Sequence, residues 1–452
     1  MNAEIIALIG LALVFAIASL RNIHMGALAL VAAFIIGIGV VGESLDDVLG
    51  GFPVDALIIL LGITYLFGIA RETGTIDWLV DRSIGLIGHR VALLPWGLWL
   101  IATGVACLGT SHAAFAVVPI AMSLAHTHRI NSTLMGIAMS SAIVGGALAP
   151  TSINGITVMT VAQTAGIPYN PALMFALSVG INALVVLVAF FLFGGRELIR
   201  RSRGIKGGAD ASPTGGLGPT GGVGTGTGGT ATLLRTDVDT AVELKKLTGM
   251  QIMVMAAIVL LVGGFFTLTQ LDVDVNLGVV ALTIAVVIAL VDPGVGRRAL
   301  NRVDWNTILL LGGIITYVGV LTRLGAIDQL GEAARSVNEP LIAALVICVI
   351  AGLVSAFAST IGILGALIPL AVPLLLVGGG LEMTGFIYAL AISASLVDCA
   401  PFGTTGATIV ASTVEQDRPR VYRNLTIWGL SMVIIGPVVT IATMVVPFML
   451  LG

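Results

Sequence analysis

The chain has 452 residues, of which 57% are hydrophobic and only 10% are charged, and its mean hydropathy is +1.08. A soluble domain carries roughly 25% charged residues, so this composition excludes a chain that exposes most of its surface to water. The formal net charge of −3 gives no indication of nucleic-acid binding. Apolar runs of the length that crosses a bilayer, roughly 17–25 residues, recur from end to end, and we expect a membrane protein throughout.

In chain order, the first half is expected to contain five crossings and one re-entrant hairpin. The first crossing, 4–20, starts with an acidic residue and has no small-residue cleavage site, which favours a retained helix over a signal peptide. The amphipathic stretch 76–88 is expected to lie along the membrane interface. The other crossings are expected at 25–42, 55–70, 133–166 and 171–195, and the hairpin at 91–126.

A segment of Gly, Thr, Pro and Ala with almost no large side chains follows, from about 207 to 240. Such a segment cannot bury enough apolar area to offset its ordering entropy. We therefore expect three parts: a first repeat at 1–200, a flexible linker at 201–247 and a second repeat at 248–452.

The second half repeats this pattern. Its crossings are expected at 250–270, 277–291, 305–322, 381–413 and 425–450, its hairpin at 340–378 and its interfacial stretch at 327–337. Matching residues recur at a nearly constant offset: Ile63-Thr64-Tyr65 returns as Ile315-Thr316-Tyr317 after 252 residues, and Ala149-Pro150 returns as Ala400-Pro401 after 251. This regularity indicates an internal duplication.

Five crossings per half is an odd number, so the second repeat must be inverted relative to the first. Basic residues favour the cytoplasmic side of a membrane. On that rule both termini lie outside and the linker lies in the cytoplasm, in a multi-pass protein of the cell inner membrane. The basic clusters that this arrangement places on one side are Arg196/Arg200/Arg201/Arg203/Lys206, Arg297/Arg298/Arg302 and Arg418/Arg420/Arg423.

Four polar breaks are expected at membrane depth. Two are hairpin tips, Gly109-Thr110-Ser111-His112 and Ser359-Thr360, and two interrupt long spans, at 149–155 (APTSING) and 400–406 (APFGTTG). Irregular backbone at that depth is tolerated only where protein buries it or where it lines a cavity. The prolines stop a helix and the glycines allow close approach to a ligand.

This chemistry suits a small anion and a cation beside it. Half-helices that start inside the membrane present free N–H groups, and hydroxyls add further donors. Freed carbonyls could hold Na⁺. Ser and Thr side chains in membrane helices also commonly bond to their own backbone, which is the structural alternative. The expected substrate-binding residues are Thr110, Ser111, His112, Ser152, Asn154, Ser359, Thr360, Thr404 and Thr405. The expected cation-binding residues are Gly109, Thr110, Asn154, Ser359, Thr360, Gly403, Thr405 and Asp398.

Asp398 is the one acid placed well inside a span, and an ionisable group there is a functional candidate. It is a candidate cation ligand, proton site or structural partner for backbone N–H groups, and the equivalent residue of the first half is Ala147. Two roles are equally compatible with His112: contact with the substrate or titration near neutral pH, and a structural hydrogen bond.

The sequence contains no catalytic constellation, no phosphate-binding glycine loop and no metal-spaced His/Cys cluster. We therefore expect a transporter rather than an enzyme, driven by an ion gradient or by exchange rather than by ATP. No cofactor is expected other than Na⁺ or H⁺ as the coupling ion.

The first half contains the stretches NIHMGALA at 22–29, Gly51-Phe52-Pro53, TYLFGIA at 64–70, GTIDWLV at 74–80 and Pro95-Trp96. In these stretches the chain resembles the dicarboxylate carrier MatC family, within the ion-transporter superfamily that includes the divalent anion/sodium symporters. The resemblance implies a homodimer in which a transport domain moves as an elevator against a scaffold, and it implies malonate or a C4-dicarboxylate as substrate.

In the sodium symporters each hairpin tip carries a Ser-Asn-Thr motif. The matching triplets here are Gly109-Thr110-Ser111 and Ser359-Thr360-Ile361, and neither contains the Asn. The choice between Na⁺ and H⁺ therefore stays open. The alternative functions are a cation/proton antiporter or an inorganic-anion carrier of the same superfamily and, in a different class, a passive anion channel.

Overall fold

A computed structural model describes residues 3–21, 23–86, 91–108, 116–204, 247–270, 276–326, 340–356, 360, 362–365, 367–368, 371 and 383–447. Every element in these ranges is helical, which confirms the expected all-helical class for this part of the chain. Most of the predicted linker (205–246), the second interfacial stretch (327–337) and the tip of the first hairpin (109–115) lie outside the described residues.

The helices of the first half follow the predicted order. The expected third crossing (55–70) is one helix, and the expected fourth crossing (133–166) consists of two helices. The expected interfacial stretch (76–88) is helical as well. In chain order they are α1 (Ala3–Arg21), α2 (Met25–Ile36) with its continuation η1 (Gly37–Val41), α4 (Val54–Glu72), α5 (Thr75–Leu86), α6 (Leu94–Cys107), α7 (Val117–Thr127), α8 (Ser132–Ala147), α9 (Ile153–Thr164) and α10 (Pro171–Leu192).

The second half presents a parallel series. Its last helix begins at Arg418, seven residues earlier than the predicted start at 425, so the third basic cluster is helical. The elements are α12 (Gly249–Gln270), α13 (Leu277–Val291), α15 (Trp305–Arg323), α17 (Pro340–Ser355), α19 (Met383–Leu396), η4 (Val397–Cys399), α20 (Thr404–Ala411), α21 (Arg418–Thr440) and η5 (Ile441–Val445).

Three short helices were not predicted from the sequence: α3 (Leu45–Gly50), α11 (Gly195–Gly204) and α14 (Pro293–Leu300). Local capping explains two of them. The Ser44 hydroxyl accepts a hydrogen bond from the backbone N–H of Asp47, and the Asp47 carboxylate accepts one from the backbone N–H of Ser44. The Ser44 hydroxyl also donates to that carboxylate and holds the pKa of Asp47 below its usual value. Asp292 caps α14 by accepting from the first two free N–H groups.

Five stretches of the described chain are both long enough and apolar enough to cross a bilayer. They are Val54–Glu72, Pro171–Leu192, Trp305–Arg323, Met383–Ala411 and Arg418–Val445. Other apolar helices in that part are shorter, at 10–17 residues. A membrane protein is therefore supported, and the count of ten crossings stays a prediction.

The outer helices expose apolar side chains at helical spacing. On α10 the large exposed apolar residues are Leu173, Leu184, Leu187, Val188, Phe191 and Leu192, most of which recur every three or four residues and so lie on one side of the helix. Comparable apolar faces occur on α13, α17 and α21. In the centre, every residue of α8 and all but one of α19 are buried, including their serines. A polar-containing centre inside an apolar exterior is the arrangement that a lipid environment requires.

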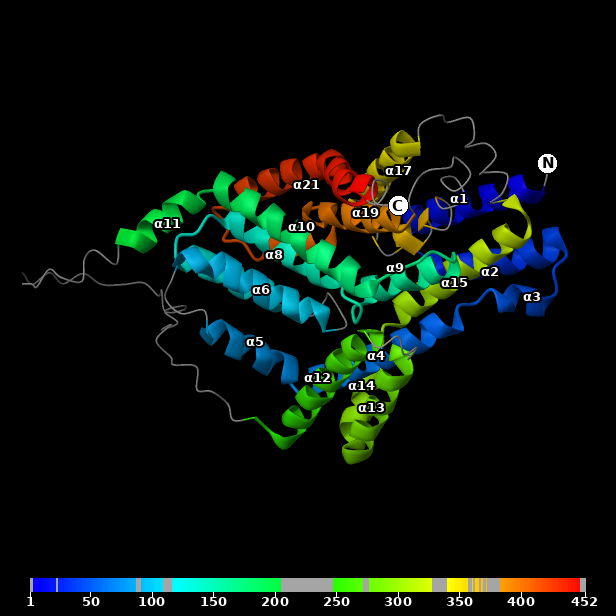
Figure 1. The fold of residues 1–452 in the computed structure, drawn as a ribbon, viewed down its shortest axis with the longest axis horizontal. Coiled ribbons are helices and arrows are strands. Elements are labelled where there is room, and N and C mark those ends of the chain that lie inside the picture. The colour runs from blue at the N-terminus through cyan, green and yellow to red at the C-terminus, as the bar shows by residue number, and fades with distance from the viewer. Residues whose placement is uncertain are drawn as a thin grey trace, which may run out of the picture.

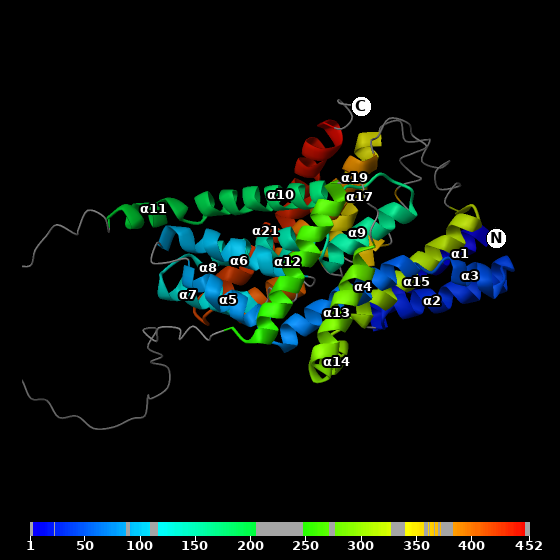
Figure 2. The same cartoon turned by 60° about the horizontal axis from the view of Figure 1, so that its bottom comes forward.

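Helices from the two halves pair across the molecule. Helix α2 packs along α15, and α13 packs along α4, as Figures 1 and 2 both show. Glycines allow both contacts: a Cβ at Gly313 would overlap the carbonyl oxygen of Gly26, and a Cβ at Gly62 would overlap that of Gly278. The two contacts are related by offsets of 251 and 252 residues, as the matching sequence motifs are.

We predict that Gly313→Ala destabilises the protein, because the new methyl group must push apart two helices that touch through their backbones. Overpacking of this kind costs about 1–3 kcal/mol. Gly180→Ala, on α10, is the matched control because nothing lies within 4 Å of its added Cβ. The melting temperatures of the two variants in detergent test this, and an equal melting temperature would contradict the observed helix contact.

Candidate functional site

Both predicted breaks in the long spans are present. Helix α8 ends at Ala147 and α9 begins at Ile153, while η4 ends at Cys399 and α20 begins at Thr404. The new helices therefore begin 251 residues apart, the offset that the sequence motifs share. Of the predicted stretches 149–155 and 400–406, residues 149–152 and 400–403 are unwound, whereas the last three residues of each stretch already belong to the next helix.

The two breaks use the same backbone hydrogen bonds. In the first, Ala149 N donates to Gly146 O, Ser152 N to Ala149 O and Ile156 N to Ser152 O, at 3.1, 2.9 and 2.9 Å. The equivalent bonds of the second are Ala400 N to Val397 O, Gly403 N to Ala400 O and Ala407 N to Gly403 O, at 2.9, 3.1 and 3.0 Å. Each donor and each acceptor is shifted by 251 residues.

A glycine closes each break. A Cβ at Gly155 would overlap the carbonyl oxygen of Ala149, and a Cβ at Gly406 would overlap that of Ala400. Any larger residue at either position would push the second half-helix away from the unwound segment. The glycines that the sequence placed in both motifs are therefore required by close backbone approach.

In the first break, the side chains are buried and one hydroxyl has no partner. Thr151 donates to the carbonyl of Cys107 at 2.5 Å, which ties the break to the end of α6. Asn154 is buried. Ser152 is fully buried, and its hydroxyl makes no hydrogen bond with the residues that the structure describes. A buried polar group without a partner is unusual, and this is the one such group of the described residues that lies in a break; the other four are Trp99, Thr103, Thr160 and Asn182.

In the second break, the predicted site residues differ in how far they are exposed. Thr405 is buried, Gly403 is half-buried at the N-cap of α20, and Thr404 is exposed on the first turn. The Thr404 carbonyl accepts from the Thr408 hydroxyl one turn later. Of the predicted pair of threonines, Thr405 is the one that faces the interior.

Asp398 and Thr360 are brought together from different parts of the second half. The Thr360 hydroxyl donates to Asp398 Oδ1 at 2.9 Å and lies 2.8 Å from the Ser355 hydroxyl at the end of α17. Thr360 and Ser355 are both buried. The structural alternative, in which the threonine bonds to its own helix backbone, does not apply here. A carboxylate and two hydroxyls provide oxygen atoms of the kind that bind Na⁺ or carry a proton.

Ser355 was not among the predicted residues. It precedes the hairpin tip by a few residues, and at the offset that matches the two tips its counterpart in the first half is Val105, so the repeat pattern contained no signal for it. The predicted residues Gly109, Thr110, Ser111, His112 and Ser359 lie outside the described part of the chain. Their roles stay predictions.

The two breaks lie in the same region of the molecule. Helix α8 contacts both η4 and α20, and α9 contacts α19. Figures 1 and 2 show α9 beside α19 in the middle of the fold. Polar groups from both halves therefore surround the buried centre that α8 and α19 form.

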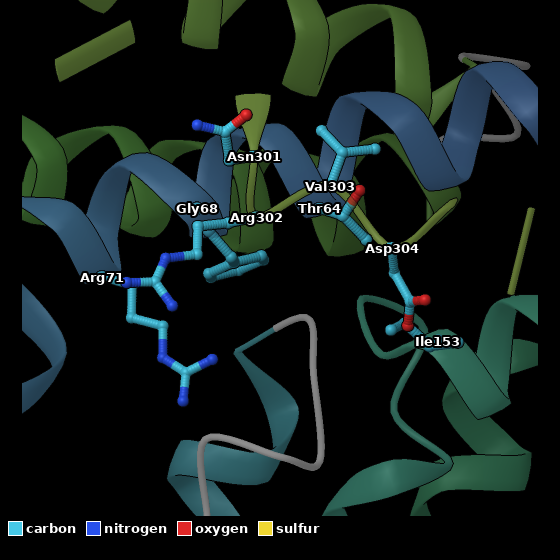
Figure 3. A pocket seen from close by; sticks show the side chains of 9 residues that line it. Thr64, Gly68, Arg71, Ile153, Asn301, Arg302, Val303 and Asp304 are labelled. Carbon is cyan, nitrogen blue, oxygen red and sulfur yellow. The ribbon is translucent and has the colours of Figure 1, made fainter. Parts of the chain in front are cut away.

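A cavity of about 250 Å³ opens beside the first break (Figure 3). One wall is a single face of α4, and the facing wall is the turn between α14 and α15. The lining residues are Thr64, Phe67, Gly68, Arg71, Ile153, Asn301, Arg302, Val303 and Asp304. Ile153 is the first residue of α9, so the cavity reaches the start of a broken helix.

Comparison with known proteins is consistent with this architecture. The chain is 26% identical over 376 residues to the uncharacterized transporter Rv2685 of Mycobacterium tuberculosis, which covers 80% of this chain and 79% of that protein. It is 24% identical over 344 residues to the uncharacterized transporter Mb2703 of Mycobacterium bovis, which covers 74% of this chain and 71% of that protein. Together with the apolar helices and the buried polar breaks, these similarities support a membrane transporter rather than an enzyme.

The family resemblance can also be stated more specifically. Residues 1–149 match the family described as the N-terminus of the dicarboxylate carrier protein MatC. The motifs that carry the resemblance in the sequence, from NIHMGALA to Pro95-Trp96, all fall in this range. The expected similarity to the MatC family is thus confirmed for the first third of the chain.

The unpartnered hydroxyl of Ser152 yields a prediction that separates binding from stability. An unsatisfied buried hydroxyl costs about 1–3 kcal/mol, so Ser152→Ala should leave the melting temperature of the ligand-free protein unchanged or raise it. The same variant should bind substrate more weakly. Thr151→Ala is the control, because it removes a hydroxyl that already has a partner and should lower the melting temperature. A clear loss of stability in Ser152→Ala would contradict a ligand-binding role for this hydroxyl.

Proposed function

We propose that the protein is a secondary active transporter of a small dicarboxylate, malonate or a C4-dicarboxylate, coupled to Na⁺ or H⁺. The observation that carries the proposal is the pair of buried helix breaks with matching hydrogen bonds at one offset. Such breaks near the middle of a membrane are where transporters built from inverted repeats bind substrate and coupling ion. The match of residues 1–149 to a dicarboxylate carrier family supports the substrate class.

The pairing of helices across the molecule supports two inverted repeats. Helix α2 of the first half packs on α15 of the second, and α13 of the second packs on α4 of the first. Ion pairs also join the two halves at both contacts. Arg323 on α15 donates to Glu43 of the first half, and Arg302 of the second half donates to Glu72 on α4. A two-fold relation between the halves accounts for both pairs of contacts.

The distribution of charge supports the proposed orientation in the cell inner membrane. The basic helix α11 lies at one end of the molecule, and α3 with the N-terminus lies at the other (Figures 1 and 2). Basic segments favour the cytoplasmic side. We therefore assign the N-terminus to the outside and the segment between the halves to the cytoplasm. The C-terminus is assigned to the outside by the expected five crossings in each half, which bring the chain back to the side on which it began.

The grouping of helices supports an elevator in a homodimer. Helices α6, α8 and α10 pack together, as do α17, α19 and α21, and these sets contain or adjoin the breaks. The paired helices α2–α15 and α4–α13 form a second group. The first group is assigned to the moving transport domain and the second to the scaffold, whose exposed apolar faces would meet the other protomer.

The buried groups also determine which substrate and ion chemistry is favoured. No arginine or lysine is placed in either break, so a dianion would be held by backbone N–H groups and hydroxyls such as those of Ser152 and Thr405. Asp398 with Thr360 and Ser355 is the proposed site of the coupling ion. A cation/proton antiporter would use the same acid but would not need hydroxyl-rich breaks in both halves. A passive channel would not need two opposed sets of broken helices.

Uptake of radiolabelled malonate and succinate into proteoliposomes tests the substrate class. We expect saturable uptake of at least one acid that depends on either an imposed Na⁺ gradient or an imposed pH gradient. Sulfate uptake measured in parallel identifies an inorganic-anion carrier. Absence of dicarboxylate uptake under every gradient would rule out the proposal, and uptake that does not saturate would favour a channel.

Substitutions at the acid and its hydroxyl partner test the proposed ion site. Asp398→Asn should abolish the dependence of uptake on the coupling ion, because the carboxylate charge is lost. Thr360→Val should weaken ion binding by removing one oxygen ligand, whereas Thr360→Ser should retain it. The concentration of Na⁺ or H⁺ that gives half-maximal uptake is the measurement. An unchanged ion profile in Asp398→Asn would assign this residue a structural role.

A further inference from the structure

The cavity between α4 and the α14–α15 turn contains an arginine that has no counter-ion among the described residues. Arg71 ends the face of α4 on which Thr64, Phe67 and Gly68 also lie, at a spacing of three to four residues that puts them on one stripe. Within the described chain, the Arg71 side chain forms no ion pair and no hydrogen bond. Arg323, the matching residue of the second repeat, donates two hydrogen bonds to Glu43 at 2.8 and 3.0 Å.

The nearby carboxylates are already engaged. Both oxygens of Glu72 accept from arginines, Oε1 from Arg302 at 2.9 Å and Oε2 from Arg298 at 3.3 Å. Both oxygens of Asp304 cap α15, where they accept from the N–H and the hydroxyl of Thr307 at 3.0 Å each. Among the described residues, Glu72 and Asp304 thus have their oxygens occupied by other donors, and neither forms an ion pair with Arg71.

The geometry of the cavity suits a small anion. Figure 3 shows Arg71 and Arg302 at one end of the pocket, and Asp304 with Ile153 at the other. A volume of about 250 Å³ is slightly below the roughly 300–1,000 Å³ of pockets that hold drug-sized ligands. A guanidinium binds a carboxylate through two parallel hydrogen bonds. A short carboxylic acid fits both the size and the charge of this space.

The position of the cavity relates it to the path of the substrate. One wall belongs to helices of the proposed scaffold, and Ile153 belongs to the broken helix of the proposed transport domain. We propose that this cavity is a second dicarboxylate site, in which Arg71 binds a carboxylate of the substrate as it passes between the first break and the cytoplasm. The inference rests on the proposed function and adds a docking residue on the scaffold, outside the predicted site.

Protection of an introduced thiol tests the site without depending on transport. Asn301 lines the cavity and is exposed, so Asn301→Cys should react with a charged methanethiosulfonate reagent in the purified, detergent-solubilised protein. Malonate or succinate should slow this reaction at least fivefold. The wild-type chain, whose cysteines are buried or half-buried, gives the background rate.

Two double variants test the role of Arg71. Adding Arg71→Gln to Asn301→Cys should abolish the protection, whereas adding Arg323→Gln should leave it in place. Arg71→Gln should also leave the melting temperature unchanged, because this side chain makes no hydrogen bond or ion pair with the part of the chain that the structure describes. Undiminished protection in the Arg71→Gln double variant would overturn the role of this residue.

The outcomes separate this inference from the proposed function. If Asn301→Cys transports dicarboxylate but its labelling is not slowed by substrate, the second site is wrong and the transport function stands. If sulfate protects as well as malonate does, the dicarboxylate assignment of the cavity is wrong. If the wild-type protein transports no dicarboxylate, the proposed function fails and the inference fails with it.

Discussion

The fold depends on one constraint: backbone groups that a broken helix releases inside a bilayer must find partners within the protein. Here the carbonyls of Ala149 and Ala400 accept hydrogen bonds from the unwound residues that follow them, and the facing glycines leave room for this close approach. The second half-helix can then restart a few residues later. The polar groups left over are the ones to which we assign solute binding. In that proposal, the same short segments serve both the fold and the binding site.

Much of this architecture could be predicted because a membrane simplifies the sequence signal. Long apolar runs located the helices, and Pro150, Gly155, Pro401 and Gly406 located the breaks, because these residue types alter the backbone directly. Because matching motifs recur in both halves, the elements predicted in one half could be compared with those predicted in the other. The hydrogen bonds of the two breaks later recurred at the offset that the motifs had shown.

What could not be predicted depends on contacts between distant segments. The bond from Thr360 to Asp398 joins residues 38 positions apart, and Ser355 enters the same cluster with no counterpart in the first half. The short helices α3 and α14 were missed because they are stabilised by caps, not by apolar periodicity. The difference between Arg71 and Arg323 was also hidden, since the sequence shows two matching arginines and only the structure shows that one of them is paired.

The burial of α8 and α19 has a consequence for how the protein responds to its membrane. These helices lead into the two breaks, and their neighbours cover almost every residue of both. Acyl chains can therefore reach the outer helices, such as α10 and α21, without touching the polar centre. Changes in bilayer thickness or lipid composition should act on the tilt and mobility of the outer helices, while the buried polar residues of α8 and α19 stay shielded from them.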